Sequence, residues 1–469
     1  MDSDFNIILN QDSYKFSQWK MYDPKMQYMY SYFEPRVGAK HSRITFFGLR
    51  YIIRKYLSGK VVTKEKINEA YEVCKRHFGS EDLFNLKGWN YILEKHGGYL
   101  PIRIYAIPER VEVEPSNVLF AVVNTDPNCA WLVNFLETML MQVWYPCTVA
   151  SEAAAMKRMI DYHYNRSCES LQGSEFAVHN FGLRACTCPD AAAIASAAHL
   201  LYFKGSDSIS GIPFLQKYYD IKDVECYAPP ASEHSVMTSR GRENEFKVFS
   251  DILDAYPEGV VSVVIDSYDA HNFVSDYAMQ LKDKILKRNG KTVFRPDSGD
   301  PVSESLDVVE RLDAIFGHST NKRGYKVLNP KVGVIWGDGI DRSGMDAILT
   351  NIEEHGWAAN NVVFGCGGKL NQCVNRDTER MACKCSAACI DGMWVDVFKD
   401  PITSNRKGDF TKHSKRGLQV YSLDKNLVKG YTNSISVNQL NVSLDDINEL
   451  IIHSEGSLMN IVFENGKEI

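Results

Sequence analysis

The spacing of apolar residues divides the chain into regions with different predicted structures. Residues 64–78 repeat apolar side chains at helical spacing, and residues 100–126 alternate as strands separated by turns that contain proline. Residues 129–145 form a strongly apolar segment that predicts one buried helix, too short to cross a bilayer. Together these patterns predict an α+β domain over residues 1–150.

The pattern changes after this first region. From residue 151 to residue 400, strand-like and helical segments alternate, which is typical of a parallel sheet or barrel with helices on the outside. Residues 401–469 return to polar, lysine-rich loops and short strands, and we expect them to pack on the N-terminal domain. The chain has no internal repeat and no low-complexity tract, which argues against a solenoid.

Composition narrows the class of protein. With 469 residues, of which 44% are hydrophobic, the chain can bury a large core in two or three domains. Its net charge of -6 gives no electrostatic reason to expect nucleic acid or a membrane surface as a partner. The N-terminus has no signal-peptide pattern, and the twelve cysteines show no paired CxxC spacing. We therefore expect a cytoplasmic enzyme whose cysteines are mostly reduced.

Four clusters of acidic residues and glycine follow strand-like runs. They are DSYD at 266–269, RPDSGDP at 295–301, GDGID at 337–341 and FGCGG at 364–368. Because ligand-binding loops lie at the carboxyl ends of parallel strands, we expect the four clusters to meet on one face. Carboxylates suit sugar hydroxyls and magnesium, and glycine-rich turns let backbone N–H groups approach a phosphate. The clusters therefore predict a site for a phosphorylated sugar.

Further polar clusters lie upstream of these carboxylates. HNFGLR at 179–184 and KGSDS at 204–208 are followed by PPASEHS at 229–235, in which His234 stands next to a glutamate. A single histidine is more often a structural hydrogen-bonding residue than a catalyst. His234 lies between two apparent ligand loops, however, so both roles stay open at this point.

Fourteen motifs in one order carry a resemblance to a known family. The chain resembles the nicotinamide phosphoribosyltransferase family of type II phosphoribosyltransferases from about Phe5 into the C-terminal segment. The motifs are DSYK (12–15), YSYFE (30–34), KGWNYILEKHGGYLPI (87–102), NTDP (124–127), HNFGLR, KGSDS, ASEHS (231–235), DSYD, RPDSGDP, GDGID, FGCGG, NRD (375–377), CKCS (383–386) and VFKDP (397–401). No single motif is specific for this family, but the occurrence of all fourteen in the same order is specific for it.

The resemblance implies a fold and a reaction. The fold is an irregular α/β barrel packed with an α+β domain, in a homodimer whose active sites lie at the subunit interface. The reaction joins nicotinamide to 5-phosphoribosyl 1-pyrophosphate and yields nicotinamide mononucleotide and pyrophosphate, a step of NAD salvage. Magnesium is the implied cofactor, and ATP is the implied coupling substrate.

The resemblance also assigns residues to the nicotinamide pocket. Phe181 would stack on one face of the pyridine ring, and Tyr14 from the partner chain would stack on the other face. Asp207 would accept a hydrogen bond from the carboxamide N–H₂ group. A carboxylate in this place would meet a like charge on nicotinate, so Asp207 would select the amide over the acid.

Other family positions would bind the phosphorylated sugar. Asp297 and the Gly337–Asp338 turn would contact the ribose hydroxyls. Gly367 and Gly368 would offer backbone donors to the 5′-phosphate. The basic positions that match the family are Arg184 and Arg295 near the ring and amide, Arg376, Lys384 and Lys399, and Arg36, which would reach across the dimer interface.

Catalysis would involve His234 and two carboxylates. By resemblance, His234 is the histidine that can be phosphorylated by ATP, with Asp266 as the partner of its second nitrogen. Asp266 and Asp297 would also contact magnesium through water. Three positions depart from the family pattern: Lys369 replaces a glycine beside the phosphate turn, and Ala228 and Pro229 replace a serine and a valine beside the tunnel to the pyridine pocket.

Two alternatives are open to test. A nicotinate or quinolinate phosphoribosyltransferase would share the barrel but would need a cationic pocket for the substrate carboxylate, and Asp207 argues against it. A binding or signalling protein without catalytic activity could also use this fold. The retained His234, Asp297 and Asp338 argue against a loss of catalysis.

Overall fold

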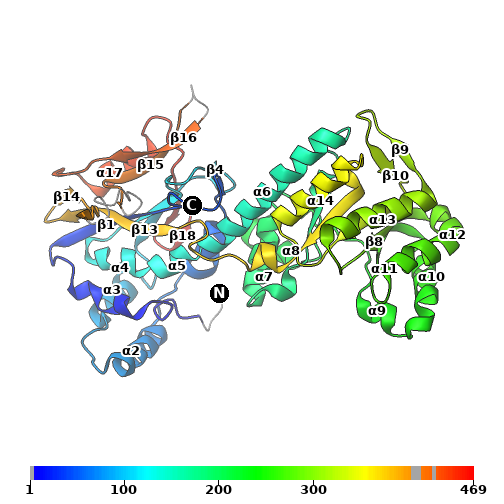
Figure 1. Ribbon diagram of the computed structural model, residues 1–469. Coiled ribbons are helices and arrows are strands. Elements are labelled where there is room, and N and C mark those ends of the chain that lie inside the picture. Colours follow the sequence, from blue (N-terminus) through cyan, green and yellow to red (C-terminus); the bar gives the residue numbers. More distant parts are fainter. Residues whose placement is uncertain (1–4, 403–412, 425–428) are drawn as a thin grey trace. The chain divides into compact units, whose positions relative to one another are not determined.

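The computed structural model describes residues 5–402, 413–424 and 429–469 and divides into two compact units (Figure 1). The first unit combines Met1–Thr148 with Asn375–Ile469, and the second is the continuous segment Val149–Val374. Residues 375–400, which the sequence pattern assigns to the barrel, thus belong to the first unit. Their strands pair with a strand near the N-terminus, a long-range contact that local periodicity does not reveal.

A seven-stranded sheet forms the centre of the first unit. Its strand order is β14-β13-β1-β5-β3-β17-β18, and each pair of neighbouring strands is antiparallel. The strands are β1 (Met26–Glu34), β3 (Ile102–Ala106), β5 (Phe120–Asn124), β13 (Ala382–Ile390), β14 (Met393–Asp396), β17 (Asn460–Glu464) and β18 (Lys467–Glu468). Two small pairs accompany it, β2 (Ile44–Thr45) with β4 (Glu112–Val113) and β15 (Leu418–Asp424) with β16 (Lys429–Ile435). The sheet is therefore built from both ends of the chain.

The apolar pattern predicts two helices of the first unit, over residues 64–78 and 129–145, and the structure agrees with only the first. Helix α2 (Lys64–Phe78) has the predicted bounds, because the Thr63 side chain accepts from the Lys66 N–H at its start and Gly79 adopts a left-handed conformation at its end. The single helix predicted over residues 129–145 is wrong. That segment forms α4 (Ala130–Phe135), α5 (Glu137–Met141) and the start of α6 (Trp144–Ser167), and the breaks let α4 pack on β1 while α5 packs on β13.

The remaining helices of the first unit are short. They are α1 (Leu49–Ile52), α3 (Leu86–Lys95) and α17 (Leu444–Ile452). Large buried side chains such as Tyr30, Trp89 and Trp394 fill the core of this unit. None of the helices within the described part of the chain has both the length and the apolar character needed to cross a membrane.

A curved parallel sheet forms the centre of the second unit. Its strand order is β6-β12-β11-β8-β7, and every pair is parallel. The strands are β6 (Val178–Asn180), β7 (Glu258–Val264), β8 (Asn289–Arg295), β11 (Val332–Trp336) and β12 (Val362–Cys366), with a separate pair β9 (His318–Thr320) and β10 (Lys326–Leu328). The helices are α7 (Pro189–His199), α8 (Gly211–Tyr219), α9 (His234–Thr238), α10 (Glu245–Ala255), α11 (Ala270–Asn272), α12 (Lys282–Lys287), α13 (Pro301–Phe316), α14 (Arg342–Glu354) and α15 (Gly368–Asn371).

Two irregular segments connect the edges of this sheet. Single parallel bridges join Asn180 to Ser206, Gly205 to Tyr227 and Ala231 to Ser262. These bridges continue from edge strand β6 through residues 204–206 and 227–231 to edge strand β7. The predicted irregular α/β barrel is therefore confirmed, and it is irregular because isolated bridges replace regular strands on one side.

An ionic cluster joins α6 to α14 in the second unit, with His163 and Glu353 buried and Asp346 exposed. His163 Nε2 lies 2.9 Å from Asp346 Oδ1, and its Nδ1 lies 3.2 Å from Glu353 Oε1. Burial lowers the pKa of His163, but the hydrogen bonds and charges of Glu353 and Asp346 outweigh it and raise this pKa above its usual 6.5. A raised folded-state pKa stabilises the fold fully below 6.5, and this contribution disappears as pH rises through the folded-state value.

We therefore expect the melting temperature of the protein to fall as pH rises from 6 through the raised pKa of His163. A His163→Gln variant should lack this part of the pH dependence, because glutamine carries no titrating charge. Calorimetric scans at several pH values measure the effect. The exposed His355 provides a matched His355→Gln control, which should keep the wild-type slope. Equal slopes in wild type and His163→Gln would contradict the prediction.

Candidate functional site

The carboxyl ends of the parallel strands bring the predicted clusters together, as the sequence pattern indicates. Asp266 follows β7, Asp297 follows β8, and Gly337 follows β11. Phe181 follows β6, and Gly367 follows β12. Because the five strands are parallel and adjacent, their last residues lie along one edge of the barrel. This edge is the candidate functional site.

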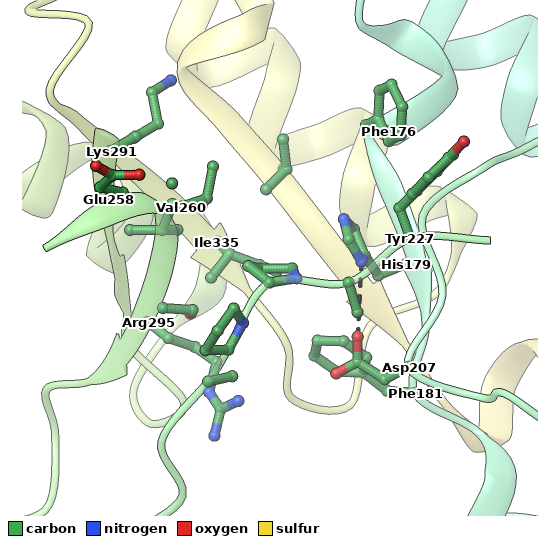
Figure 2. A pocket seen from close by; sticks show the side chains of 18 residues that line it. Phe176, His179, Phe181, Asp207, Tyr227, Glu258, Val260, Lys291, Arg295 and Ile335 are labelled. Carbon is green, nitrogen blue, oxygen red and sulfur yellow. Dashed lines mark ion pairs between the residues drawn. The ribbon is translucent and has the colours of Figure 1, made fainter. Parts of the chain in front are cut away.

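A cavity of about 540 Å³ extends through the barrel from this edge (Figure 2). Its wall is mostly apolar and includes Val260, Val293, Ile335 and Val363 from the strands. His179, Phe181, Asp207 and Arg295 line it near the carboxyl ends of the strands, whereas Glu258 and Lys291 line it near their amino ends. An apolar channel with a few polar groups at its ends suits a flat ring with one polar substituent.

Two glycines make room for the Phe181 ring. A Cβ atom at Gly365 would lie 2.0 Å from the Phe181 ring, and one at Gly337 would lie 3.1 Å from it. A Cβ at Gly337 would also lie 3.2 Å from Asp297 Oδ1. Gly337, predicted as a sugar contact, therefore also supports an aromatic side chain. Sequence reasoning missed Gly365, although a glycine inside a strand is a known signal of close approach.

The loop that carries Asp207 is held by hydrogen bonds to β6. The Asp207 N–H donates to the Asn180 carbonyl at 3.2 Å, and Ser208 Oγ donates to the same carbonyl at 3.1 Å. The Asn180 side chain in turn pairs with the Asn371 side chain at 3.1 Å. The Asp207 carboxylate stays 40% exposed and faces the cavity, where His179 Nδ1 lies 3.7 Å from it. Sequence reasoning gave no separate role to His179 or Asn180.

His234 and Asp266 lie together, as the resemblance implies. His234 is the first residue of α9, and its Nε2 lies 3.3 Å from Asp266 Oδ1. The His234 side chain is half exposed, whereas the Asp266 side chain is only 6% exposed. A buried carboxylate that holds one imidazole nitrogen leaves the other nitrogen available to react with an electrophile. This geometry suits a histidine nucleophile.

Asp297 lies beside Arg295 and close to other charged side chains. The Arg295 Nε atom lies 3.4 Å from Asp297 Oδ2. Burial raises the pKa of Asp297, and the charge of Asp266 raises it further. The Arg295 guanidinium lowers this pKa, but the net effect is a pKa above the usual value. Asp297 Oδ1 is buried without a hydrogen-bond partner among the described residues. A buried oxygen of this kind is suited to a hydroxyl or hydrated cation that would complete its shell.

The acidic residues at this edge fit magnesium held through water. Asp266 and Asp297 influence each other electrostatically, and Asp297 also feels the charge of exposed Asp338. Within the described residues, neither belongs to a group of three close ligand atoms that would enclose an ion directly. Magnesium usually keeps several waters and takes one or two carboxylates together with substrate oxygens. The donor set therefore fits outer-shell contact better than an all-protein cage.

The remaining predicted residues divide between the two units. Arg184 lies in a short 3-10 helix that contacts α7, and Gly368 begins α15, where its Cβ position would lie 3.4 Å from Ala185. Exposed Lys369 is the next residue of α15. The predicted residues of the first unit are Tyr14, Arg36, Arg376, Lys384 and Lys399. Their proposed contacts with the sugar phosphate and the pyridine stay predictions.

Comparisons with known proteins agree with this arrangement. Residues 176–446 match the nicotinate phosphoribosyltransferase (NAPRTase) family, and residues 6–104 match the nicotinamide phosphoribosyltransferase N-terminal domain. The chain is 41% identical over 420 residues to a nicotinamide phosphoribosyltransferase of Xanthomonas campestris pv. campestris, covering 88% of this chain and 86% of the relative. It is 32% identical over 445 residues to one of Acinetobacter baylyi, covering 87% and 86%.

Solved structures support the fold alone. The nicotinate-nucleotide pyrophosphorylase of Pyrococcus furiosus superposes with a TM-score of 0.58 at 15% identity, covering 100% of this chain and 92% of the other. Human nicotinic acid phosphoribosyltransferase superposes with a TM-score of 0.52 at 15% identity, covering 97% and 89%. The two-unit architecture with a curved parallel sheet is therefore shared with these structures.

Proposed function

Because the chain belongs to the nicotinate phosphoribosyltransferase family, we propose that it joins nicotinamide to 5-phosphoribosyl 1-pyrophosphate, yielding nicotinamide mononucleotide and pyrophosphate. The observation that carries the choice of nicotinamide is the Asp207 carboxylate, which faces an apolar cavity beside the Phe181 ring. A carboxylate accepts from an amide N–H₂ group but repels a carboxylate on the ligand. The two relatives described above are both named nicotinamide phosphoribosyltransferase.

The cavity would position the attacking ring. Phe181 is held against Gly365, so it offers a fixed face for stacking in the narrow part of the barrel. Asp207 would bind the carboxamide and thereby turn the ring nitrogen toward the carboxyl edge of the strands. Positioning of this kind converts a bimolecular displacement into a nearly unimolecular one.

The carboxyl edge would stabilise the charges that form during displacement. Departure of pyrophosphate leaves positive charge on the ribose, which the carboxylates of Asp297 and Asp266 can stabilise. The backbone at Gly367 and Gly368 would receive the 5′-phosphate at the start of α15. Magnesium, held through water by Asp266 and Asp297, would neutralise charge on the pyrophosphate oxygens.

A direct product test decides the reaction. The protein is incubated with magnesium, 5-phosphoribosyl 1-pyrophosphate and equal concentrations of nicotinamide and nicotinate, and the nucleotides are identified by mass. We expect nicotinamide mononucleotide as the main product. Predominant nicotinate mononucleotide would establish the acid-specific alternative, and the absence of both nucleotides would favour a binding protein without catalytic activity.

We further propose that ATP phosphorylates His234 and thereby couples its hydrolysis to product formation. The 3.3 Å contact with Asp266 supports this role, because it fixes one imidazole nitrogen and leaves the other exposed. With labelled ATP, the wild-type chain and a His355→Ala control should gain an acid-labile label, whereas His234→Ala should gain none. Equal labelling of His234→Ala and wild type would place any phosphorylation elsewhere.

We also propose a cytoplasmic homodimer whose partner chains share active sites. Exposed apolar side chains in the first unit, including Tyr14 at 55%, Met21 at 74% and Val37 at 54%, support association of this unit with another surface. Tyr14 and Arg36 would act in the site of the partner chain. Sedimentation at several concentrations measures the oligomeric state, and a monomer throughout would exclude this arrangement.

A further inference from the structure

The side chains of His179 and Asp207 lie next to each other in the cavity. His179 is the middle residue of β6, and its Nδ1 lies 3.7 Å from Asp207 Oδ1, as the dashed line in Figure 2 shows. Their side chains are 11% and 40% exposed, respectively. This separation is too long for a strong hydrogen bond, but it lies within the range in which two charges interact strongly in a poorly solvated site.

The His179 ring is fixed by a glycine on the neighbouring segment. A Cβ atom at Gly205 would lie 2.8 Å from both Cδ2 and Nε2 of this ring, so the ring packs where only glycine leaves room. The Gly205 carbonyl in turn lies 2.9 Å from His199 Nε2. Burial lowers the pKa of His199 to about 4, so His199 is neutral at physiological pH. His199 therefore adds no positive charge behind His179, and the Lys204 ammonium next to Gly205 is paired with Glu225 at 2.7 Å.

Backbone hydrogen bonds hold the loop that carries Asp207 in place. Its N–H donates to the Asn180 carbonyl at 3.2 Å, and the adjacent Ser206 N–H donates to the Tyr227 carbonyl at 3.0 Å. His179 and Asp207 thus come from two adjacent segments of the barrel, β6 and residues 204–208. Their separation is set by backbone hydrogen bonds rather than by flexible side chains alone.

We propose that His179 is a positioning residue that controls discrimination between amide and acid substrates, an inference that rests on the proposed phosphoribosyl transfer to nicotinamide. The substrate's polar substituent meets the combined charge of His179 and Asp207. With a neutral imidazole the pair carries one negative charge and excludes nicotinate. With a protonated imidazole the pair is neutral overall, and the exclusion of nicotinate weakens.

The other charged groups of the cavity lie on different strands. Arg295 is the last residue of β8, at the carboxyl edge. Glu258 is the first residue of β7, and Lys291 lies near the start of β8. Tyr227 also lines the cavity, on the segment next to Gly205. Imidazole gains its proton between roughly pH 8 and pH 5. His179 is the histidine among the described residues that line the cavity, so its charge is the one that the proposal concerns.

The test measures kcat/KM for nicotinamide and for nicotinate at pH 6 and pH 8 in saturating phosphoribosyl pyrophosphate. Neither pyridine changes its own charge in this range. For the wild type, we expect the amide-to-acid ratio to fall about tenfold between pH 8 and pH 6, as a unit charge a few ångströms away in a partly buried site predicts. For His179→Gln, we expect the ratio to change by less than about twofold, because glutamine carries no charge at either pH.

The variant His355→Gln is the matched control. His355 is an exposed histidine at the end of α14, and this control should keep the full pH dependence of the wild type. His179→Asn is a second test variant, since its shorter amide can donate from a position close to Nδ1 without titrating. It should keep kcat/KM for nicotinamide near the wild-type value while its amide-to-acid ratio stays independent of pH, which a merely structural role of His179 would not produce.

Two results would overturn the proposal: a wild-type ratio that does not change with pH, or a His179→Gln variant with the wild-type pH dependence. Failure of the proposed phosphoribosyl transfer to nicotinamide would give a different result. In that case the wild type would form no nicotinamide mononucleotide at either pH. Calorimetry gives the ratio of the dissociation constants of the two pyridines without turnover, and the pH dependence of this ratio tests the charge effect in a folded but slow variant.

Discussion

Replacing Asp297 by asparagine should lower kcat by about a hundred- to a thousandfold, the loss typical when one electrostatic group at a developing charge is removed. Asp297 is held beside Arg295 with one carboxylate oxygen buried and unpaired among the described residues. Asparagine keeps the size but removes the negative charge that would face the ribose and the hydrated magnesium. Initial rates at saturating substrates measure kcat, and the magnesium dependence of the rate should weaken in parallel.

A nearby aspartate supplies the control for this loss. Asp300 caps α13 by accepting from the Ser303 N–H at 2.9 Å, and its carboxylate has no role in the proposed site. Asparagine is an equally good helix cap, so Asp300→Asn should keep kcat within about twofold. If Asp297→Asn is as active as Asp300→Asn, the carboxylate of Asp297 has no part in stabilising the transition state.

The second large effect is expected at Asp207. A charge-assisted hydrogen bond is worth roughly 1.5–3 kcal/mol, so Asp207→Asn should lower kcat/KM for nicotinamide about ten- to a hundredfold. The same change removes the charge that repels nicotinate, so the preference for the amide should narrow. Competition between the two pyridines, with product masses as the measurement, gives this preference directly.

The nearby Glu225 offers a comparison with a carboxylate outside the cavity. It is paired with Lys204 on the surface at 2.7 Å, and Glu225→Gln should leave both substrates' kcat/KM nearly unchanged. If Asp207→Asn preserves the wild-type amide preference, another residue selects the substrate. The assignment of the pyridine pocket would then be wrong at this position.

The sequence predicted the part of the site that follows from strand order. Asp266, Asp297 and Gly337 each lie within two residues of the end of a strand, and adjacent parallel strands bring such residues to one edge. The family resemblance, rather than this rule, supplied the roles of Asp207 and His234. The contact between His179 and Asp207 was not predicted, because it depends on an isolated bridge between segments without regular strand pattern.

The fold was predicted least well where apolar residues occur on all sides of a segment. Helix α2 has one apolar face and clear caps, so its bounds follow from local signals. Residues 129–145 are apolar throughout, and only their different packing partners decide where α4 ends and α5 begins. Likewise, the pairing of β13 with β1 joins residues such as Met26 and Ile390, which lie far apart in the sequence, and periodicity cannot report such a contact.

The division of the chain between the two units has a consequence for its synthesis. Residues 149–374 are continuous, so the ribosome releases every strand of the barrel before the last part of the first unit exists. The large sheet of the first unit, in contrast, needs β17 next to β3 and β13 next to β1. Until those late strands emerge, the early strands expose unpaired edges. We infer that the barrel can fold while translation continues, whereas the first unit completes only after it and depends most on chaperones.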